Sequence, residues 1–584
     1  MYMKKLLAAV LGMLSMQMIS AQTYKVSWGE EMKLKKGTTD IDIIAADNTG
    51  LYFTEKRLAM TGYFVLAATY GTAAKLFKLD KNFKEVFEKD YKKELKGYDF
   101  HSFQMLEKDL FMFVTDYIKK EKLFKVFVVR LDKGSGDLLG GFTEIGSYEQ
   151  ENKREVFDMA VNPIRNGTAF LAVANISGKE RVSLGVTVLD KNLKKKESAI
   201  INMAIAPGYY SLEDVQLTST NKIVVLGREF EETTIGKKKK KKLVFKQYTM
   251  SIYSNNGKKE KDVSLNAGDR FVIGGKLIES PTGEMLLAGF HSNTSKKEDL
   301  NGFFINKVDA EKGEVTLSSF KEINTGMLGK SFEDPSDEDD EIKQNKKEKQ
   351  KVKEDDDQDE LPNRFIIKSV DINPADNSII ITSEISQYSY YSYTTSSYNS
   401  STKSWSNTTN YVHRFTNKDI LVINADKNGN IKWINDVPKS QVEEIRSSST
   451  RNNSNGLSIS SESSLSGYFV RGGGMPYYSS YTRLLTDKTL VLLINDHASN
   501  NVISSYGDKV KTIYNFKKQS NAYGISIDLA TGTMTKRMIA ENTKDAILTP
   551  RHALVVGSEI FMPSWRMHAL AKSELKFAKI SVKP

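Results

Sequence analysis

The chain has 584 residues without a cysteine, and its 84 lysine and arginine residues outnumber 73 acidic ones for a net charge of +11. The lack of cysteine excludes disulfides, thiolate metal sites, a cysteine nucleophile and lipid attachment through an N-terminal cysteine. The basic balance favours anionic partners, although a solvated lysine-rich surface accounts for it as well.

Residues 1–21 have the pattern of a cleavable signal peptide. A basic start precedes an apolar run from Leu6 to Met18, and small residues follow at Ser20 and Ala21. This run is too short to span a bilayer, and no later segment is apolar for long enough to do so. We therefore expect an exported protein, not a lipoprotein, in the periplasm of a Gram-negative bacterium, or secreted or at the cell surface. We expect no transmembrane span in the mature chain and no binding of nucleic acid.

One hairpin pattern recurs along the mature chain, in which an alternating apolar strand, a turn and a more polar strand follow one another. The turns of the seven copies are centred on Asp80, Asp132, Asp190, Asn255, Asp309, Asp426 and Asp528. A second hairpin precedes each copy, as in the segments MLEKDLFMFV, MAVNPIRNGTAFLAV, QLTSTNKIVVLG, KLIESPTGEMLLAG, SVDINPADNSIIIT and LLTDKTLVLLI. Two hairpins make four antiparallel strands, which is the unit of a β-propeller blade.

The turns are 52, 58, 65, 54, 117 and 102 residues apart, and both long gaps contain segments of unusual composition. A charged segment at 328–362 and a Ser/Thr/Tyr-rich segment at 387–412 lie in the first gap. A Ser/Asn-rich segment at 444–466 lies in the second. We interpret all three as loops or disordered inserts, the charged one as disordered, in a single propeller domain over residues 22–584.

The two ends of the chain each supply an unpartnered strand. After the seventh repeat, the hairpin ALVVGSEIFMPSW is followed by a lone strand, LKFAKISV, and the mature chain begins with an alternating segment, TYKVSWGEEMKL. Pairing these segments removes an open sheet edge. We therefore predict an all-β β-propeller of eight four-stranded blades, closed by the N- and C-terminal strands; seven blades are the alternative.

No catalytic, metal or cofactor site is visible in the sequence. The turn at Asp426 resembles a calcium loop, but Ile431 stands where glycine is required and no glutamate closes the loop. No Gly-x-Ser-x-Gly nucleophile motif occurs. The six histidines form no ligand pair at i+2, i+3 or i+4; they are His101, His291, His413, His497, His552 and His568.

Two of the turns resemble the blade motif of the quinoprotein-like eight-bladed propellers, Ala-x-Asp-x-x-x-Gly-x-x-x-Trp. The matching residues are Gly429 with Trp433, and Asp528 with Thr531 and Gly532. That group includes quinone-dependent dehydrogenases and a non-enzymatic subunit of the outer-membrane barrel-assembly machinery. The tryptophan recurs in no other repeat, and the vicinal cysteines of the dehydrogenases are missing. The resemblance therefore implies a scaffold and no bound cofactor.

Two kinds of surface are candidates for binding. Tyrosine among small polar residues is typical of adaptable binding loops, although a low-complexity linker has the same composition. The candidate residues are Tyr388, Tyr390, Tyr391, Tyr393, Tyr398, Trp405, Tyr477, Tyr478 and Tyr481. Six consecutive lysines form either an electrostatic patch for phosphate-bearing lipid or an acidic partner, or an exposed hairpin tip; they are Lys237, Lys238, Lys239, Lys240, Lys241 and Lys242.

These observations leave two hypotheses for function. The first is a non-enzymatic scaffold for protein–protein interaction, an accessory part of an outer-membrane assembly or secretion complex, with envelope or outer-membrane proteins as partners. The second is a propeller that binds or cleaves a glycan at its central axis, with anionic glycans or lipopolysaccharide as partners. Residues of opposite charge with His and Tyr around the axis would favour the second, and a lysine-filled or apolar axis would weigh against it.

Overall fold

The structure is a computed structural model. It describes residues 23–583 except for 34–37, 58–73, 151–158, 164–168, 179, 236–239, 266, 269, 294–299, 324–364, 402–403, 453–476, 503–509, 543–546 and 567–573. The predicted signal peptide and the charged insert therefore lie outside the described residues. No helix among the described residues is long and apolar enough to cross a membrane.

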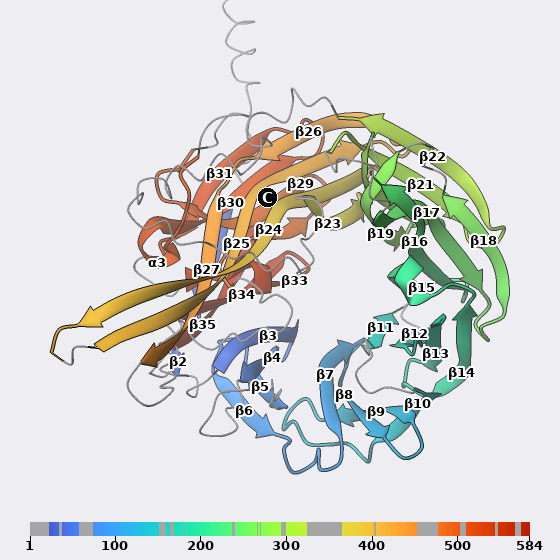
Figure 1. The fold of residues 1–584 in the computed structure, drawn as a ribbon, viewed down its shortest axis with the longest axis horizontal. Helices are drawn as coiled ribbons and strands as arrows, with labels where there is room; N and C mark the ends of the chain where they lie inside the picture. Colours follow the sequence, from blue (N-terminus) through green and yellow to red (C-terminus); the bar gives the residue numbers. More distant parts are fainter. Residues whose placement is uncertain are drawn as a thin grey trace, which may run out of the picture.

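The described strands form eight antiparallel sheets that follow one another around a central axis as the blades of a β-propeller (Figure 1). The strands of blades 1 to 4 are β3 (Thr38–Asp47), β4 (Gly50–Arg57), β5 (Lys75–Leu79) and β6 (Glu85–Asp90); β7 (Asp99–Leu106), β8 (Asp109–Ile118), β9 (Leu123–Leu131) and β10 (Thr143–Glu149); β11 (Met159–Pro163), β12 (Ala169–Asn175), β13 (Val182–Asp190) and β14 (Lys195–Met203); and β15 (Tyr210–Leu217), β16 (Ile223–Ile235), β17 (Lys240–Tyr253) and β18 (Lys259–Leu265).

Blades 5 to 7 continue the same order from the axis outward. Their strands are β19 (Phe271–Glu279), β20 (Met285–Ser292), β21 (Gly302–Asp309) and β22 (Glu314–Glu322); β23 (Phe365–Ile372), β24 (Ile379–Asn399), β25 (Ser404–Ala425), β26 (Ile431–Val437) and an added β27 (Gln441–Asn452); and β28 (Tyr481–Leu485), β29 (Thr489–His497), β30 (Ser520–Asp528) and β31 (Met534–Ala540). Short helices are η1 (Pro207–Tyr209), α3 (Phe516–Gln519) and η5 (Pro550–His552).

Blade 8 joins both ends of the chain, as predicted. It contains β32 (Ile547–Leu548), β33 (Leu554–Val556), β34 (Glu559–Arg566), β35 (Glu574–Lys583), β1 (Thr23–Trp28) and β2 (Met32–Lys33). Strand β1 pairs with β35 from Thr23 opposite Lys583 to Trp28 opposite Ala578. Tyr24 of β1 also packs on blade 7, where its ring lies 2.4 Å from the place of a Cβ on Gly524, so only glycine leaves room there. The predicted pairing of the two terminal segments is confirmed.

All seven predicted turns join the third strand of a blade to its fourth. At six of them an aspartate side chain accepts hydrogen bonds from the backbone of the turn, and at the turn of Asn255 the side chain of Asn256 accepts one from the Lys258 N–H at 3.2 Å. Asp80, for example, accepts hydrogen bonds from the backbone N–H of Asn82 at 2.8 Å and of Lys84 at 2.9 Å. These turns also need a left-handed residue, which is glycine at Gly429 (φ 80°) and Gly532 (φ 74°). Such side-chain bonds replace the missing ladder bonds of a turn, which is why this signal was readable in the sequence.

The hydrophobic core lies between the blades. Eight clusters of buried side chains each join two neighbouring sheets, from blades 1 and 2 through to blades 8 and 1. Trp433 extends this pattern at the rim, because its indole N–H donates to the carbonyl oxygen of Leu529 at 3.0 Å in the next blade. Gly532 lies against the same indole, since a Cβ there would be 3.0 Å from the Trp433 ring. Trp433 and Gly532 thus serve blade-to-blade packing here.

The prediction of loop structure for 387–412 is wrong. These residues continue β24 and β25, which pair from Ser386 opposite Asn417 to Asn399 opposite Ser404. The prediction is also wrong for the first part of 444–466, since β27 runs to Asn452 and pairs with β25. Serine, threonine and tyrosine were treated as loop composition, but threonine and tyrosine favour strands once a partner strand is in place.

Candidate functional sites: an axial cavity and a projecting arm

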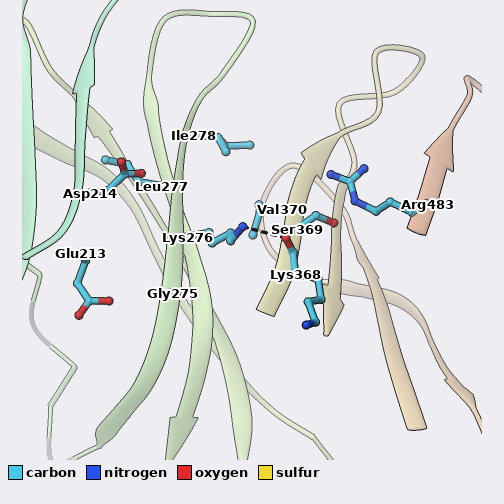
Figure 2. Close-up of a pocket in the computed structure, with 10 residues that line it drawn as sticks. All are labelled: Glu213, Asp214, Gly275, Lys276, Leu277, Ile278, Lys368, Ser369, Val370 and Arg483. Carbon is cyan, nitrogen blue, oxygen red and sulfur yellow. Dashed lines mark hydrogen bonds between the residues drawn. The ribbon is translucent and has the colours of Figure 1, made fainter. Parts of the chain in front are cut away.

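A cavity of about 410 Å³ lies between the innermost strands of blades 4, 5, 6 and 7 (Figure 2). Because these strands face the axis, the cavity combines residues that are far apart in the sequence. Its lining residues are Glu213, Asp214, Gly275, Lys276, Leu277, Ile278, Lys368, Ser369, Val370 and Arg483. Five of them carry charge, so the cavity is polar rather than apolar.

Lys276 and Arg483 reach toward β23 from opposite sides of the cavity (Figure 2). The Lys276 ammonium donates a hydrogen bond to the carbonyl oxygen of Lys368 at 2.8 Å. Burial, and secondly the positive charge of Arg483, lowers the pKa of Lys276. The Arg483 guanidinium binds Asp371 at 3.0 Å. Two cations therefore lie close enough to repel each other in a partly desolvated space.

The acidic side of the cavity is formed by β15. Glu213 accepts a charged hydrogen bond from Arg228 at 2.7 Å. Asp214 accepts one from the Gln216 amide at 2.8 Å, and burial raises the pKa of its carboxyl. Glu213 is thus largely neutralised by its partner, whereas Asp214 remains a polar group on the wall.

Lys368 connects the cavity to a buried polar network in blade 6. Its ammonium lies 3.3 Å from Glu384, and burial lowers its pKa. Glu384 is fully buried, and Lys439, also fully buried, donates to its other oxygen at 2.7 Å. The charges of Lys439 and Lys368 outweigh burial and lower the pKa of Glu384. A buried carboxylate held by two ammonium groups stays ionised.

The second candidate site is the arm, which we define as Ser386–Asn417 of β24 and β25 together with β27. Figure 1 shows it in yellow, projecting beyond the ring. At its root, which is the end that joins the blade 6 sheet, Tyr388 packs on Phe415 with ring centroids 5.1 Å apart. Both contact the core shared by blades 8 and 1, which also holds Trp565. The arm thus starts in blade 6 and is seated on distant blades.

Buried hydrogen bonds fix the root of the arm to the segment before β28. Gln441 of β27 accepts from the Lys439 ammonium at 3.1 Å and from the Ser480 N–H at 2.8 Å, and its amide donates to Asn495 O at 2.6 Å. Glu443 accepts from the N–H groups of Tyr477 at 2.6 Å and of its two successors. Burial raises the pKa of Glu443 to about 7 despite these bonds.

The predicted tyrosines separate into two groups. Tyr388, Tyr390, Tyr391 and Tyr393 are half-buried on β24, so part of each ring remains at the surface of the arm. The rings of Tyr391 and Tyr393 lie stacked at 6.5 Å. Nothing is described of the side chains of Tyr398 and Trp405, although both residues belong to the paired strands.

The second tyrosine group does not form an exposed binding loop. Tyr477 is 4% exposed and packs edge-on against Trp565 at 5.4 Å. Tyr481 is 8% exposed, and its hydroxyl donates to Thr382 at 2.9 Å. Tyr478 is half-buried between Tyr477 and Phe516. The expectation that Tyr477 and Tyr481 lie in an exposed binding loop is wrong, because both rings are buried between blades.

The six-lysine patch lies on the hairpin of β16 and β17. Its first three residues, Lys237 to Lys239, fall outside the described residues, and β17 begins at Lys240. Lys241 is exposed and lies 2.7 Å from Glu232 on the paired strand. An acid of the same hairpin therefore neutralises part of the predicted patch.

The residues of the axial cavity were not predicted. Lys276, Lys368 and Arg483 stand singly among apolar strand residues on three blades, so no local motif marks them. Within the described residues, no group of three or more His, Asp or Glu side chains is placed to hold a metal ion. Only the inward position on an innermost strand could have suggested them.

Comparison with known proteins assigns no family to the chain. No family model and no curated protein matches the chain. Among solved structures it is similar to the β-propeller domain of the Trilobed protease from Pyrococcus furiosus, with 9% identity, 85% of this chain and 99% of that chain covered and a TM-score of 0.34. It is also similar to a polysaccharide lyase, with 8% identity, 94% and 99% covered and a TM-score of 0.31. For a Synechocystis ACO mutant the values are 9%, 88%, 93% and 0.34.

Proposed function

We propose that the protein is a non-enzymatic interaction scaffold of the cell envelope and that its arm contacts a protein partner. The observation that carries this proposal is a tyrosine-rich sheet that projects beyond the ring and whose root is fixed by buried polar groups. No charged residue occurs in the arm part of β24, from Ser386 to Asn399. Tyrosine with serine and threonine offers large contact area and adaptable hydrogen bonding.

The fixed root supports a role in which the propeller presents the arm to a protein partner. Association costs less entropy when the binding surface is already ordered, so a fixed arm binds a given partner more tightly than a loose one. A buried network such as that of Glu384, Lys439 and Gln441 adds little net stability compared with apolar packing. We infer that it serves to fix the direction in which the arm points.

The partner that we propose is an envelope or outer-membrane protein. The signal-peptide pattern of residues 1–21 and the quinoprotein-like turn at Gly429 and Trp433 support this, since the resemblance is nearer to the non-enzymatic outer-membrane-assembly type than to the dehydrogenases. The basic surface keeps anionic glycan or lipopolysaccharide as a further partner.

Glycan cleavage at the axis receives less support. The ten residues that line the axial cavity include neither histidine nor tyrosine, and three of the five charged ones are Lys or Arg. A general acid and base pair aimed at one reacting bond is what cleavage would need. Glu213 is paired with Arg228, which leaves Asp214 alone on that wall.

The test compares two shortened hairpins. In the first, Asn-Gly replaces residues 393–410, so that Ser392 and Tyr411 close the turn and the root is kept. In the matched control, Asn-Gly replaces 234–241, so that Thr233 and Lys242 close the hairpin of β16 and β17. After cross-linking in the native envelope, we expect the full chain and the control to recover the same protein and the shortened arm to lose it. Recovery of the full chain alone, or equal recovery by both variants, would overturn the proposal.

A further inference from the structure

The axial cavity holds two cations: Arg483 is paired with Asp371, and Lys276 is near the acids Asp214 and Asp371 without an ion pair to either. The Lys276 ammonium donates one hydrogen bond to a backbone carbonyl. None of the ion pairs between described residues includes this ammonium. An ammonium has three donors and a guanidinium five. Asp371 takes one position on Arg483 at 3.0 Å, so both groups keep donors for a ligand.

The two cations belong to strands that the propeller fixes separately. Lys276 lies on β19 and Arg483 on β28, with β23 between them (Figure 2). Inner strands of neighbouring blades hold such positions rigidly, because each blade face is packed in a core cluster. The pair therefore forms a preformed site, in which an anion would relieve the repulsion between like charges.

The opposite wall decides what kind of anion fits. Asp214 on β15 faces the same cavity, and its carboxyl is bonded to Gln216 on one oxygen. The Asp214 carboxylate would repel a dianion such as phosphate. The same carboxylate can accept a hydrogen bond from a hydroxyl group of a ligand. The cavity of about 410 Å³ has room for a small organic molecule.

We propose that this cavity binds a small hydroxy-carboxylate, whose carboxylate lies between Lys276 and Arg483 and whose hydroxyl groups donate to Asp214. The planar guanidinium suits a carboxylate, because two N–H groups can meet its two oxygens. This site goes beyond the proposed function, which depends on the arm and not on the cavity. Binding alone is inferred, with no bond made or broken.

Calorimetric titration of the full mature chain tests the site, with D-gluconate as the probe. D-glucose has similar hydroxyls without the carboxylate, acetate has the carboxylate without the hydroxyls, and inorganic phosphate is the competing anion. We expect gluconate to bind at least tenfold more tightly than each of the three. Lys276→Met and Arg483→Met should each weaken gluconate binding tenfold or more, and Asp214→Asn should reduce the preference for gluconate over acetate.

The control is Lys307→Met. Lys307 also donates to a backbone carbonyl of the next blade, that of Lys427 at 2.7 Å, but it lies outside the cavity. Its loss should leave gluconate binding unchanged, and thermal melting should show that each variant is folded. Gluconate binding no tighter than that of phosphate or glucose would overturn the proposal. So would a folded Lys276→Met or Arg483→Met protein that binds gluconate like the parent chain.

Discussion

In the described part of the propeller, two hairpins extend beyond their blades, and they differ in how they are attached. In blade 4, β16 and β17 pair as far as Ile235 opposite Lys240, and the ion pair of Glu232 with Lys241 near the end joins side chains that are 39% and 76% exposed. In blade 6, β24 and β25 continue for many more pairs, gain β27 as a third strand and are fixed at the root by fully buried Glu384 and Lys439.

The comparison shows that a hairpin can extend beyond its blade without having a fixed direction. A surface ion pair is screened by water and contributes little, so the blade 4 hairpin holds its direction mainly through backbone pairing. The root of the arm has a buried ion pair and aromatic packing on distant blades. Only the arm therefore has a direction set by the tertiary structure, and mutations at the two hairpins should differ strongly in effect.

The largest effect should follow from Lys439→Met. Loss of this ammonium leaves the buried Glu384 carboxylate with Lys368 as its remaining ionic partner, which should cost about 3–5 kcal/mol of unfolding free energy. Urea titration measures it. In the double variant Glu384→Leu, Lys439→Met, which removes both charges, part of the loss should return. A loss below about 1 kcal/mol in the single variant would show that the ion pair of Lys439 with Glu384 does not hold the root of the arm.

A smaller effect should appear in the pH dependence of stability through Glu443. Burial raises its folded pKa to about 7, above the ordinary value of 4.5 in the unfolded chain. Its contribution is therefore full below pH 4.5 and is lost as the pH rises through 7, by about 3 kcal/mol at most. Glu443→Gln cannot titrate, so its stability should fall less between pH 5 and pH 8 than that of the parent chain. Parallel curves for the two proteins would contradict this assignment.

The smallest effect should come from the blade 4 hairpin. Lys241→Ala or Glu232→Ala removes an exposed pair, so the urea midpoint should stay within the error of the measurement. The same urea titration as for Lys439→Met gives the direct comparison. A clear drop in the midpoint would mean that this hairpin, too, has a fixed direction.

Much of the fold was predictable because its signals are local. The turn aspartates bond to backbone groups two to four residues ahead, so their spacing reports the strands on either side. The closure of blade 8 was predictable for a related reason, since a lone strand at each end leaves an unpaired edge that the other can cover.

The candidate sites were predictable only in part. Five tyrosines of β24 were named as candidates, but the strand that carries them was interpreted as a loop, because composition does not show that a third strand pairs with the hairpin. Tyr477 and Tyr481 were wrongly expected at the surface. A tyrosine looks the same in the sequence whether its ring meets solvent or the Trp565 indole of another blade.

The repeat, the turns and the joining of the chain ends follow from the sequence alone, since each depends on contacts within one hairpin or on the number of strands. The tertiary structure decided the direction of the arm and the meeting of Lys276, Asp214 and Arg483. These depend on how whole sheets are placed around the axis, and that placement comes from apolar packing between blades, which many sequences satisfy equally well.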